Sequence, residues 1–398
     1  MHGAPAQGPN KTGVSASRLM LAMAEVEADR NNWDEAVDLA AEASKAVRAA
    51  KLLHSNAAEL AKSVELAACA RGVEAYLAAG GADALAHDLG LHASDVAEAF
   101  DEKNATSPVH RLQAEHLAVG LKLSTLHANG ALLDGDTVSA LMGVCESVAG
   151  LKDGKFGRGQ RSIVMPATLQ RAGTMSFALG EHELAEDLLD AAARAGAAAL
   201  DDPATVLDTL LPPAQAAELV ASALAGKAHI AMERADWDAA EELLSQALKL
   251  AEGISGAKHP RIAPLLTLLA TVFARTARVT VAEGIFRTAA KVAGLEPFAP
   301  GPQPPLPRCV HPAAAAALAW RHAQLLSALP KRETETDAWA QTGQALFGAV
   351  PNGFGDEIEE AFGGLEGLRA GGGGLGAGYV VDVTLRRALV CRAASASA

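Results

Sequence analysis

The segment that decides the fold is Ala235–Glu252, with the sequence ADWDAAEELLSQALKLAE. Within it, Ala240, Leu244 and Ala247 recur at helical spacing and therefore lie on one face of a helix. Small side chains on either side of a large one let a neighbouring helix approach closely and nest against that face. The segment therefore predicts a helix that packs tightly as one half of a helical hairpin.

The same small–large–small scheme recurs elsewhere in the chain. Trp33 opens a segment in which small residues follow, just as Trp237 precedes Ala240. After Trp33 the residues at this spacing are all small, namely Ala36, Ala40 and Ala43. Full copies of the scheme are Ala185, Leu189 and Ala192, with Gly173 in the preceding helix, and Ala282, Phe286 and Ala289. The repetition predicts a stack of antiparallel helical hairpins.

Composition agrees with a helical fold. The chain has 398 residues, more than the about 250–300 at which single cores stop growing, so two lobes or one elongated array are expected. Hydrophobic residues make up 50% of the chain but aromatic residues only 4%, so alanine and leucine supply the core. Strands favour β-branched and aromatic residues, whereas alanine is the best helix former. We therefore predict an all-α protein.

Turn-forming and low-complexity stretches divide the chain. Residues 150–160, GLKDGKFGRGQ, and residues 296–312, EPFAPGPQPPLPRCVHP, are the clearest interruptions. The predicted parts are a disordered tail at 1–16, helical hairpins at 17–150, a Gly/Lys loop at 151–160, an array at 161–295, a Pro-rich connector at 296–312, a terminal hairpin at 313–349 and a Gly-rich tail at 350–398. The tail contains one strand-like segment, Tyr379–Leu385, which either docks on the array or pairs with another chain.

Charge and cysteine usage narrow the function classes. The formal net charge is −13, which repels phosphate backbones, so nucleic acid is not an expected partner. The four cysteines are far apart with no CxxC, which predicts neither a disulfide framework nor a zinc ribbon. We expect a reduced intracellular compartment, either the cytoplasm or, if the N-terminal segment is a presequence remnant, an organelle matrix. The longest apolar run, residues 262–273, is too short for a membrane span, so we expect a soluble protein.

The central part of the chain resembles the tetratricopeptide repeat (TPR) family. The resemblance rests on His259-Pro260, then Leu266, Leu269-Ala270 and Phe273, then Ala282-Glu283, Phe286 and Ala289. The interval of 42 residues from Ala240 to Ala282 is longer than the basic TPR unit of about 34 residues and is similar to the long-loop variety of kinesin light chains. The resemblance covers residues 161–295 well and 17–50 fairly. It implies an α-solenoid that binds proteins.

In TPR arrays the first helix of each hairpin lines a concave groove. The matching positions in this chain are Gln170, Thr174, Phe177, Ala225, His229, Met232, Thr267, Thr271 and Ala274. Family members that clamp a terminal carboxylate place Lys, Arg and Asn at such sites, and this set contains none of these. The resemblance therefore implies a neutral groove suited to a helix or an extended segment of a partner. The alternative is that these residues pack against the array's own interior or its C-terminal tail.

No motif points convincingly to catalysis, a metal or a cofactor. The glycines of the run at 371–376 match a dinucleotide loop formally, but no helix follows to face a pyrophosphate. The basic loop residues Lys152, Lys155, Arg158 and Arg161 could form a site for an anion or an acidic partner. We predict a non-catalytic protein–protein interaction scaffold or adaptor without a cofactor. The alternative is a structural accessory subunit permanently incorporated in a larger complex, such as an organellar one.

Overall fold

The computed structural model describes residues 12–29, 32–49, 143, 145–146, 164–201, 213–297, 310, 312–348, 358–365, 379–383 and 387–390. The chain divides into two compact units. The first comprises residues 1–137, 155–168 and 202–212, and the second comprises residues 138–154, 169–201 and 213–398. Each unit is considered by itself below.

The described part of the first unit contains one long helical hairpin. Helix α1 spans Thr12–Asp29 and α2 spans Trp33–Ala49. Ala24, Ala36 and Ala43 are fully buried where the two helices meet, as the small-residue pattern predicts. The prediction that residues 1–16 form a disordered tail is wrong for 12–16, because α1 already begins at Thr12. The buried Ser17 hydroxyl donates to the Ala43 carbonyl at 2.8 Å, a tertiary bond that supports this first part of α1.

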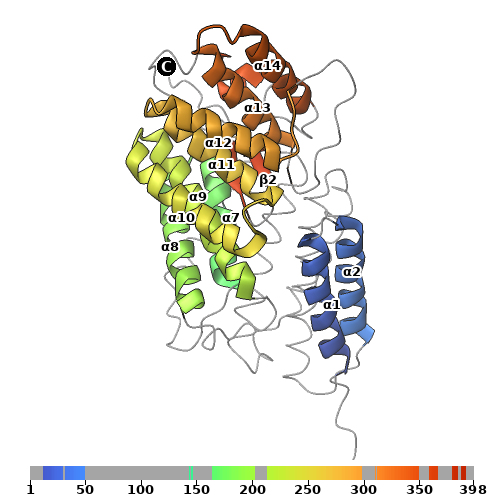
Figure 1. The fold of residues 1–398 in the computed structure, drawn as a ribbon. Coiled ribbons are helices and arrows are strands. Elements are labelled where there is room, and N and C mark those ends of the chain that lie inside the picture. The colour runs from blue at the N-terminus through green and yellow to red at the C-terminus, as the bar shows by residue number, and fades with distance from the viewer. Residues whose placement is uncertain are drawn as a thin grey trace, which may run out of the picture. The chain divides into compact units, whose positions relative to one another are not determined.

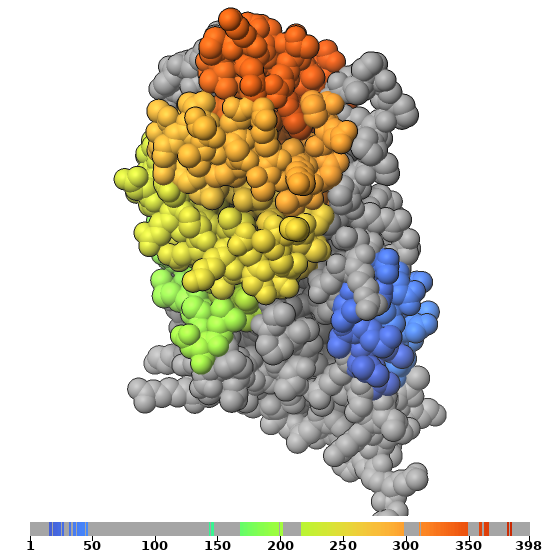
Figure 2. All heavy atoms as spheres, viewed as in Figure 1, coloured from blue at the N-terminus to red at the C-terminus, as the bar shows by residue number. Residues whose placement is uncertain are grey.

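The second unit is a stack of helical hairpins (Figures 1 and 2). Its helices are α7 (Val164–Ala178, which begins in the first unit), α8 (His182–Asp201), α9 (Pro213–Glu233), α10 (Trp237–Ser255), α11 (Ala263–Arg275), α12 (Val279–Val292), α13 (Pro312–Ser327) and α14 (Glu333–Phe347). Helices α9/α10, α11/α12 and α13/α14 pack as pairs, and each pair contacts the next. The predicted α-solenoid of antiparallel hairpins is confirmed.

A tight turn joins the two helices of each hairpin. Ala235, Ala277 and Lys331 adopt φ angles of 56°, 60° and 62°, and Gly180 adopts 90°. A residue with this left-handed backbone conformation lets the chain reverse its direction within a few residues. After the turn at Ala235, Asp236 caps α10 by accepting a hydrogen bond from the Ala239 amide at 3.1 Å.

The helix-packing residues lie where the sequence pattern places them. Ala240, Leu244 and Ala247 are completely buried, and so are Ala282, Phe286 and Ala289 of α12. A short 3-10 helix, η2 (Pro260–Ile262), precedes α11, and the His259 ring accepts a hydrogen bond from the Arg261 amide at 3.2 Å. The histidine–proline dipeptide therefore initiates this hairpin as the sequence indicates.

The C-terminal tail folds back as a small β-hairpin. Strand β1 spans Tyr379–Asp382 and β2 spans Arg387–Val390. They pair antiparallel, with Val381 opposite Ala388. The prediction of one strand-like segment is wrong, because a second strand of the same tail pairs with it. The predicted strand continued to Leu385, which left no room for a turn before Arg387.

A short helix closes the end of the stack. Helix α15 (Ile358–Phe362) packs on α13 and α14. The Gln324 amide of α13 donates to the carbonyls of Phe362, Gly363 and Gly364 at 3.1, 3.1 and 2.9 Å. These bonds satisfy carbonyls at the end of α15 that have no partner within the helix. Among the described helices, none is long and apolar enough to cross a membrane.

Candidate interaction surface

The C-terminal β-hairpin lies on the first helices of two hairpins: β1 contacts α9 and β2 contacts α13. We call the surface of the first helices on which it lies the inner face. Alanines Ala313–Ala317 at the start of α13 are all buried, and their small side chains let a strand approach the helix closely. The inner face is therefore occupied by the chain's own tail.

Two side chains of α9 accept hydrogen bonds from the backbone of β1 and of the residue that follows it. The Val381 amide donates to His229 Nε2 at 3.2 Å, and the Val383 amide donates to Ser222 Oγ at 3.1 Å. Both valines are buried, and so is Val380, which points to the opposite face of the strand. Helix α9 thus takes the position that a third strand would occupy beside β1.

Two residues of α7 form a hydrogen-bond network with Ser222, the side chain that accepts the Val383 amide. Gln170 donates through Nε2 to Ser222 Oγ at 2.8 Å and to Thr174 Oγ1 at 2.9 Å. Gln170, Thr174 and Ser222 are all buried. Because a buried polar side chain is costly without partners, this network fixes the Ser222 hydroxyl where β1 meets it.

The protonation state of His229 follows from its surroundings. Its Nε2 accepts the Val381 proton, so the ring is neutral and carries its own proton on Nδ1. Complete burial, together with a smaller effect of the charge of Arg321 on α13, lowers the pKa of His229 to about 3. Phe177 lies beside the ring, with centroids 5.6 Å apart. His229 is therefore a neutral acceptor throughout the physiological pH range.

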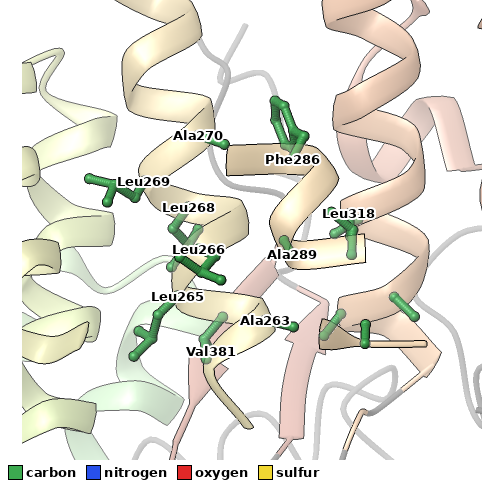
Figure 3. Close-up of a cluster of buried hydrophobic side chains, with 14 of the residues drawn as sticks. Ala263, Leu265, Leu266, Leu268, Leu269, Ala270, Phe286, Ala289, Leu318 and Val381 are labelled. Atoms are coloured by element: carbon green, nitrogen blue, oxygen red, sulfur yellow. The ribbon is translucent and has the colours of Figure 1, made fainter. Parts of the chain in front are cut away.

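The apolar side of β1 joins the main core. Figure 3 shows Val381 next to Ala263 and Leu265 at the start of α11, in one buried cluster with Leu318 and Phe286. The strand therefore rests on polar side chains at one edge and on the hydrophobic core through its face. Backbone bonding and side-chain burial both hold it in place.

The nine groove positions implied by the family resemblance are distributed as follows. Four of them lie in or next to the network that holds β1, namely Gln170, Thr174, Phe177 and His229. Thr267 and Thr271 are buried and donate to carbonyls of their own helix at 2.8 Å. Ala225 and Met232 are core residues, and Ala274 is half-buried. Contact of these nine residues with a partner protein stays a prediction.

Sequence reasoning missed Ser222, which belongs to the same stripe of α9. It precedes Ala225 by one helical turn and His229 by two, so extending the groove pattern toward the start of the helix would have included it. The basic loop residues Lys152, Lys155, Arg158 and Arg161 lie outside the described residues, as do 371–376.

Other potentially reactive groups in the described residues are structural in character. Burial raises the pKa of the Cys145 thiol to about 11, and its Sγ donates to the Ala172 carbonyl at 3.6 Å. Such a thiol is not reactive at neutral pH. In the described part of the chain, no group of three or more His, Cys, Asp or Glu residues is arranged to hold a metal ion.

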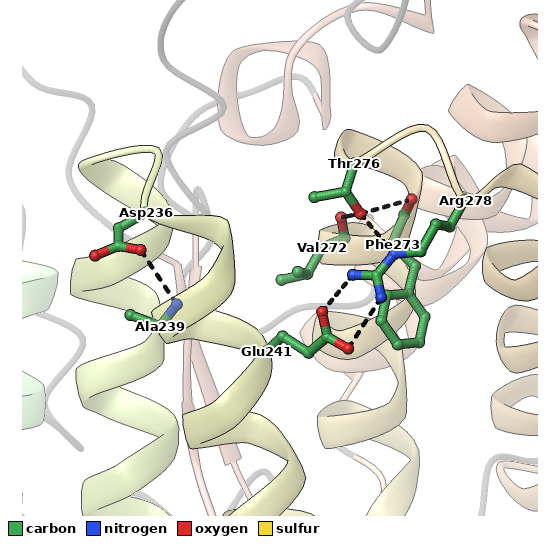
Figure 4. Close-up of polar contacts among 7 residues, drawn as sticks. All are labelled: Asp236, Ala239, Glu241, Val272, Phe273, Thr276 and Arg278. Atoms are coloured by element: carbon green, nitrogen blue, oxygen red, sulfur yellow. Dashed lines mark hydrogen bonds and ion pairs between the residues drawn. The ribbon is translucent and has the colours of Figure 1, made fainter.

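Ion pairs at the hairpin turns set the register of the stack. Arg234 pairs with Glu186 at 2.9 and 2.6 Å, Arg278 pairs with Glu241 through both guanidinium nitrogens, and Arg332 contacts Glu283 at 2.5 Å. Figure 4 shows Arg278 between Glu241 and Thr276, with its guanidinium over the Phe273 ring. Each glutamate directly follows the small alanine of its helix. The pairs therefore link each hairpin to the next one at an equivalent point.

Comparison with known proteins agrees with this architecture. Residues 219–293 match the family model described as tetratricopeptide repeat, and the match covers α10, α11, α12 and the larger part of α9. No curated protein matches the chain at a significant level. The matching description is that of the repeat in general, so the likeness to the kinesin-light-chain variety stays a prediction. With repeating hairpins on both sides of the matched segment, the chain is a TPR-like helical repeat protein.

Proposed function

We propose that the protein is a non-catalytic scaffold or adaptor that binds a partner protein on its helical array. TPR arrays are surfaces for protein recognition, and the matched repeats form the middle of the stack. The observation that carries the proposal is the β-hairpin on the inner face, because it shows that this face accommodates an extended polypeptide. The partner would be a protein segment that meets the same helices.

The chemistry of the inner face favours an uncharged segment. Gln170, Thr174, Ser222 and the neutral His229 offer hydrogen-bonding groups without formal charge. The predicted groove residues on α7, α9 and α11 would then contact a partner through shape and backbone hydrogen bonds. The acidic net charge of −13 supports a protein partner over a nucleic acid.

The test is recovery of the tagged full-length chain from its native cells after cross-linking, with the cross-links mapped by mass spectrometry. We expect a protein partner whose cross-links fall on α9, α11 and α13. Recovery of the chain alone, or cross-links that avoid these helices entirely, would contradict the proposal.

The same preparation separates an adaptor from a permanently incorporated subunit. Labelled free chain is added to the isolated complex and its incorporation is followed over time. An adaptor exchanges with the labelled chain, whereas a permanent subunit does not exchange until the complex is denatured.

A further inference from the structure

We propose that β1 is a built-in, displaceable occupant of the inner face, and that this face takes an extended partner segment with the chemistry of β1. The inference deepens the proposed protein-binding role and rests on it. The partner segment is a β-strand with small β-branched side chains on both of its faces. Its binding requires the tail hairpin to leave.

The first step is the way in which β1 is held. Amide groups of a strand point alternately to its two edges, and those of Val381 and Val383 point away from β2 toward α9. Side chains of a helix accept them, in place of the carbonyls of a third strand. Contacts of this kind recognise backbone and not a particular sequence, so any extended segment of suitable size presents the same donors.

The second step is the selection of side chains. Val380 and Val381 are 0% and 2% exposed and point to opposite faces, so the strand is covered on both faces. Val381 lies against Ala263 and Leu265 (Figure 3). A charged or long side chain at this position would be buried without a partner. The site therefore selects small apolar residues, above all the β-branched ones that favour an extended backbone.

The third step is the weak independent stability of the hairpin. The sheet has two strands of four residues each, and isolated hairpins of this size are marginally stable in water. The hairpin therefore depends on the array for its structure. Because the hairpin belongs to the same chain as the array, its docking is intramolecular, and a partner segment must compete with this contact.

The occupant in the resting protein is the tail of the same chain. Helix α15, which precedes the hairpin in the chain, packs on α13 and α14, and β2 packs on α13 as well. The hairpin therefore docks on one of the two helices that the preceding element contacts. A swap with a second copy gains no contact over this closed form.

The first experiment uses the full-length chain and a fluorescent peptide that copies residues 379–390, YVVDVTLRRALV. Peptide binding is followed by fluorescence anisotropy. A chain with Val381→Asp and Val383→Asp has a disabled tail, so the peptide should bind about tenfold more tightly to it than to the wild type, which its tethered hairpin blocks. Val281→Asp is the matched control, because Val281 is 50% exposed on α12 and the same change there should leave the affinity at the wild-type value.

The role of His229 is tested in the tail-disabled chain. His229→Leu removes the acceptor and should weaken peptide binding about tenfold, whereas His229→Gln keeps an acceptor oxygen and should stay within about threefold. Equal affinities for the two variants would overturn the assignment of His229. Circular dichroism confirms that each variant is folded before binding is measured.

A measurement without any substitution guards against misfolded variants. Hydrogen exchange is recorded on the wild-type chain with and without excess peptide. We expect faster exchange at the Val381 and Val383 amides in the presence of peptide, while the amides of α9 stay protected. Unchanged exchange at both valines under saturating peptide would overturn the proposal.

Three further outcomes decide which molecule occupies the inner face and which of the two proposals holds. If a mixture of wild-type and tail-disabled chains forms dimers by light scattering, the displaced hairpin enters a second copy, which overturns the assignment to a different protein. If the peptide behaves as expected but no partner is recovered from cells, the strand-binding face stands and the adaptor proposal fails. If the wild-type and tail-disabled chains recover a partner equally, the adaptor proposal stands and displacement is overturned.

Discussion

At the scale of single residues, close packing in the array depends on glycines that face a large side chain. Leu189 of α8 is held between two of them: a Cβ on Gly173 would lie 2.7 Å from Leu189 Cγ, and a Cβ on Gly226 would lie 2.8 Å from Leu189 Cδ1. Distances this short are not tolerated without movement of the neighbours. The glycines therefore set how closely α7 and α9 approach α8.

The corresponding prediction is that Gly173→Val lowers the free energy of unfolding by about 2 kcal/mol, because the added side chain overpacks the contact with Leu189. The control is Gly284→Ala in α12, where nothing lies within 4 Å of the added Cβ. That change should raise stability by about 0.5–1 kcal/mol through reduced backbone entropy. Urea unfolding measures both, and a Gly173→Val protein as stable as the wild type would contradict the packing argument.

Two buried histidines make stability depend on pH. Burial lowers the pKa of His322 to about 4 and that of His229 to about 3. Glu283 partly opposes the shift at His322, whereas Arg287 and Arg332 add to it. Neither ring nitrogen of His322 has a hydrogen-bond partner among the described residues, and the ring is stacked on Phe286 at 5.4 Å between centroids.

The sign follows from proton binding. Below about pH 6.5 the unfolded state binds a proton at each histidine and the folded state does not, so stability falls as the pH falls. Between pH 7 and pH 5 each histidine should remove roughly 2 kcal/mol of stability. His322→Phe keeps the aromatic packing and should remove about half of this dependence. Identical slopes of stability against pH for the variant and the wild type would rule out His322 as a source.

At the scale of elements, ion pairs fix how one hairpin sits on the next. Those at the turns are exposed, as for Arg234 and Glu186, whose side chains are 51% and 41% accessible. The pair between Arg261 of η2 and Glu218 of α9 is different, because its side chains are only 5% and 13% accessible. Removing one member of such a pair leaves a charge in a poorly solvated place.

We therefore expect Glu218→Gln to destabilise the protein by about 3 kcal/mol, since it removes the carboxylate that compensates Arg261. Glu186→Gln removes the same charge at an exposed site and should not change the melting temperature measurably. The comparison is made by thermal unfolding at pH 7. Equal effects of the two substitutions would show that burial does not distinguish the pairs.

At the scale of the second unit, the β-hairpin connects parts of the stack that are not neighbours. Strand β1 contacts α9 and β2 contacts α13, and the α11/α12 hairpin lies between these helices in sequence. In a simple repeat array each hairpin contacts only the adjacent ones, so unfolding can proceed stepwise. The docked tail should instead couple distant hairpins into one cooperative transition.

The prediction is that Val381→Asp with Val383→Asp broadens the urea transition of the full-length chain and lowers its m-value, because the hairpins then unfold less cooperatively. Val281→Asp, at an exposed site, serves as the control and should leave the m-value unchanged. A tail-disabled chain that unfolds as sharply as the wild type would show that the tail does not couple the hairpins.

The sequence by itself determined the helical hairpins and their packing faces. Ala240, Leu244 and Ala247 carry the information locally, since helical spacing alone places them on one face and small size alone permits close approach. Inferences of this kind need only the geometry of a single helix. The groove positions on α7 and α9 came instead from the resemblance to TPR arrays, and their contact with a partner stays a prediction.

Only the tertiary structure decided what covers that surface. The docking of β1 depends on contacts between residues as distant in sequence as Val383 and Ser222, and nothing in either local pattern specifies the other. The second strand, Arg387–Val390, is too short and too ordinary in sequence to stand out before its pairing with β1 is seen. Long-range pairing is set by the summed burial and hydrogen bonding of the whole fold, which is why periodicity predicted the array and not its occupant.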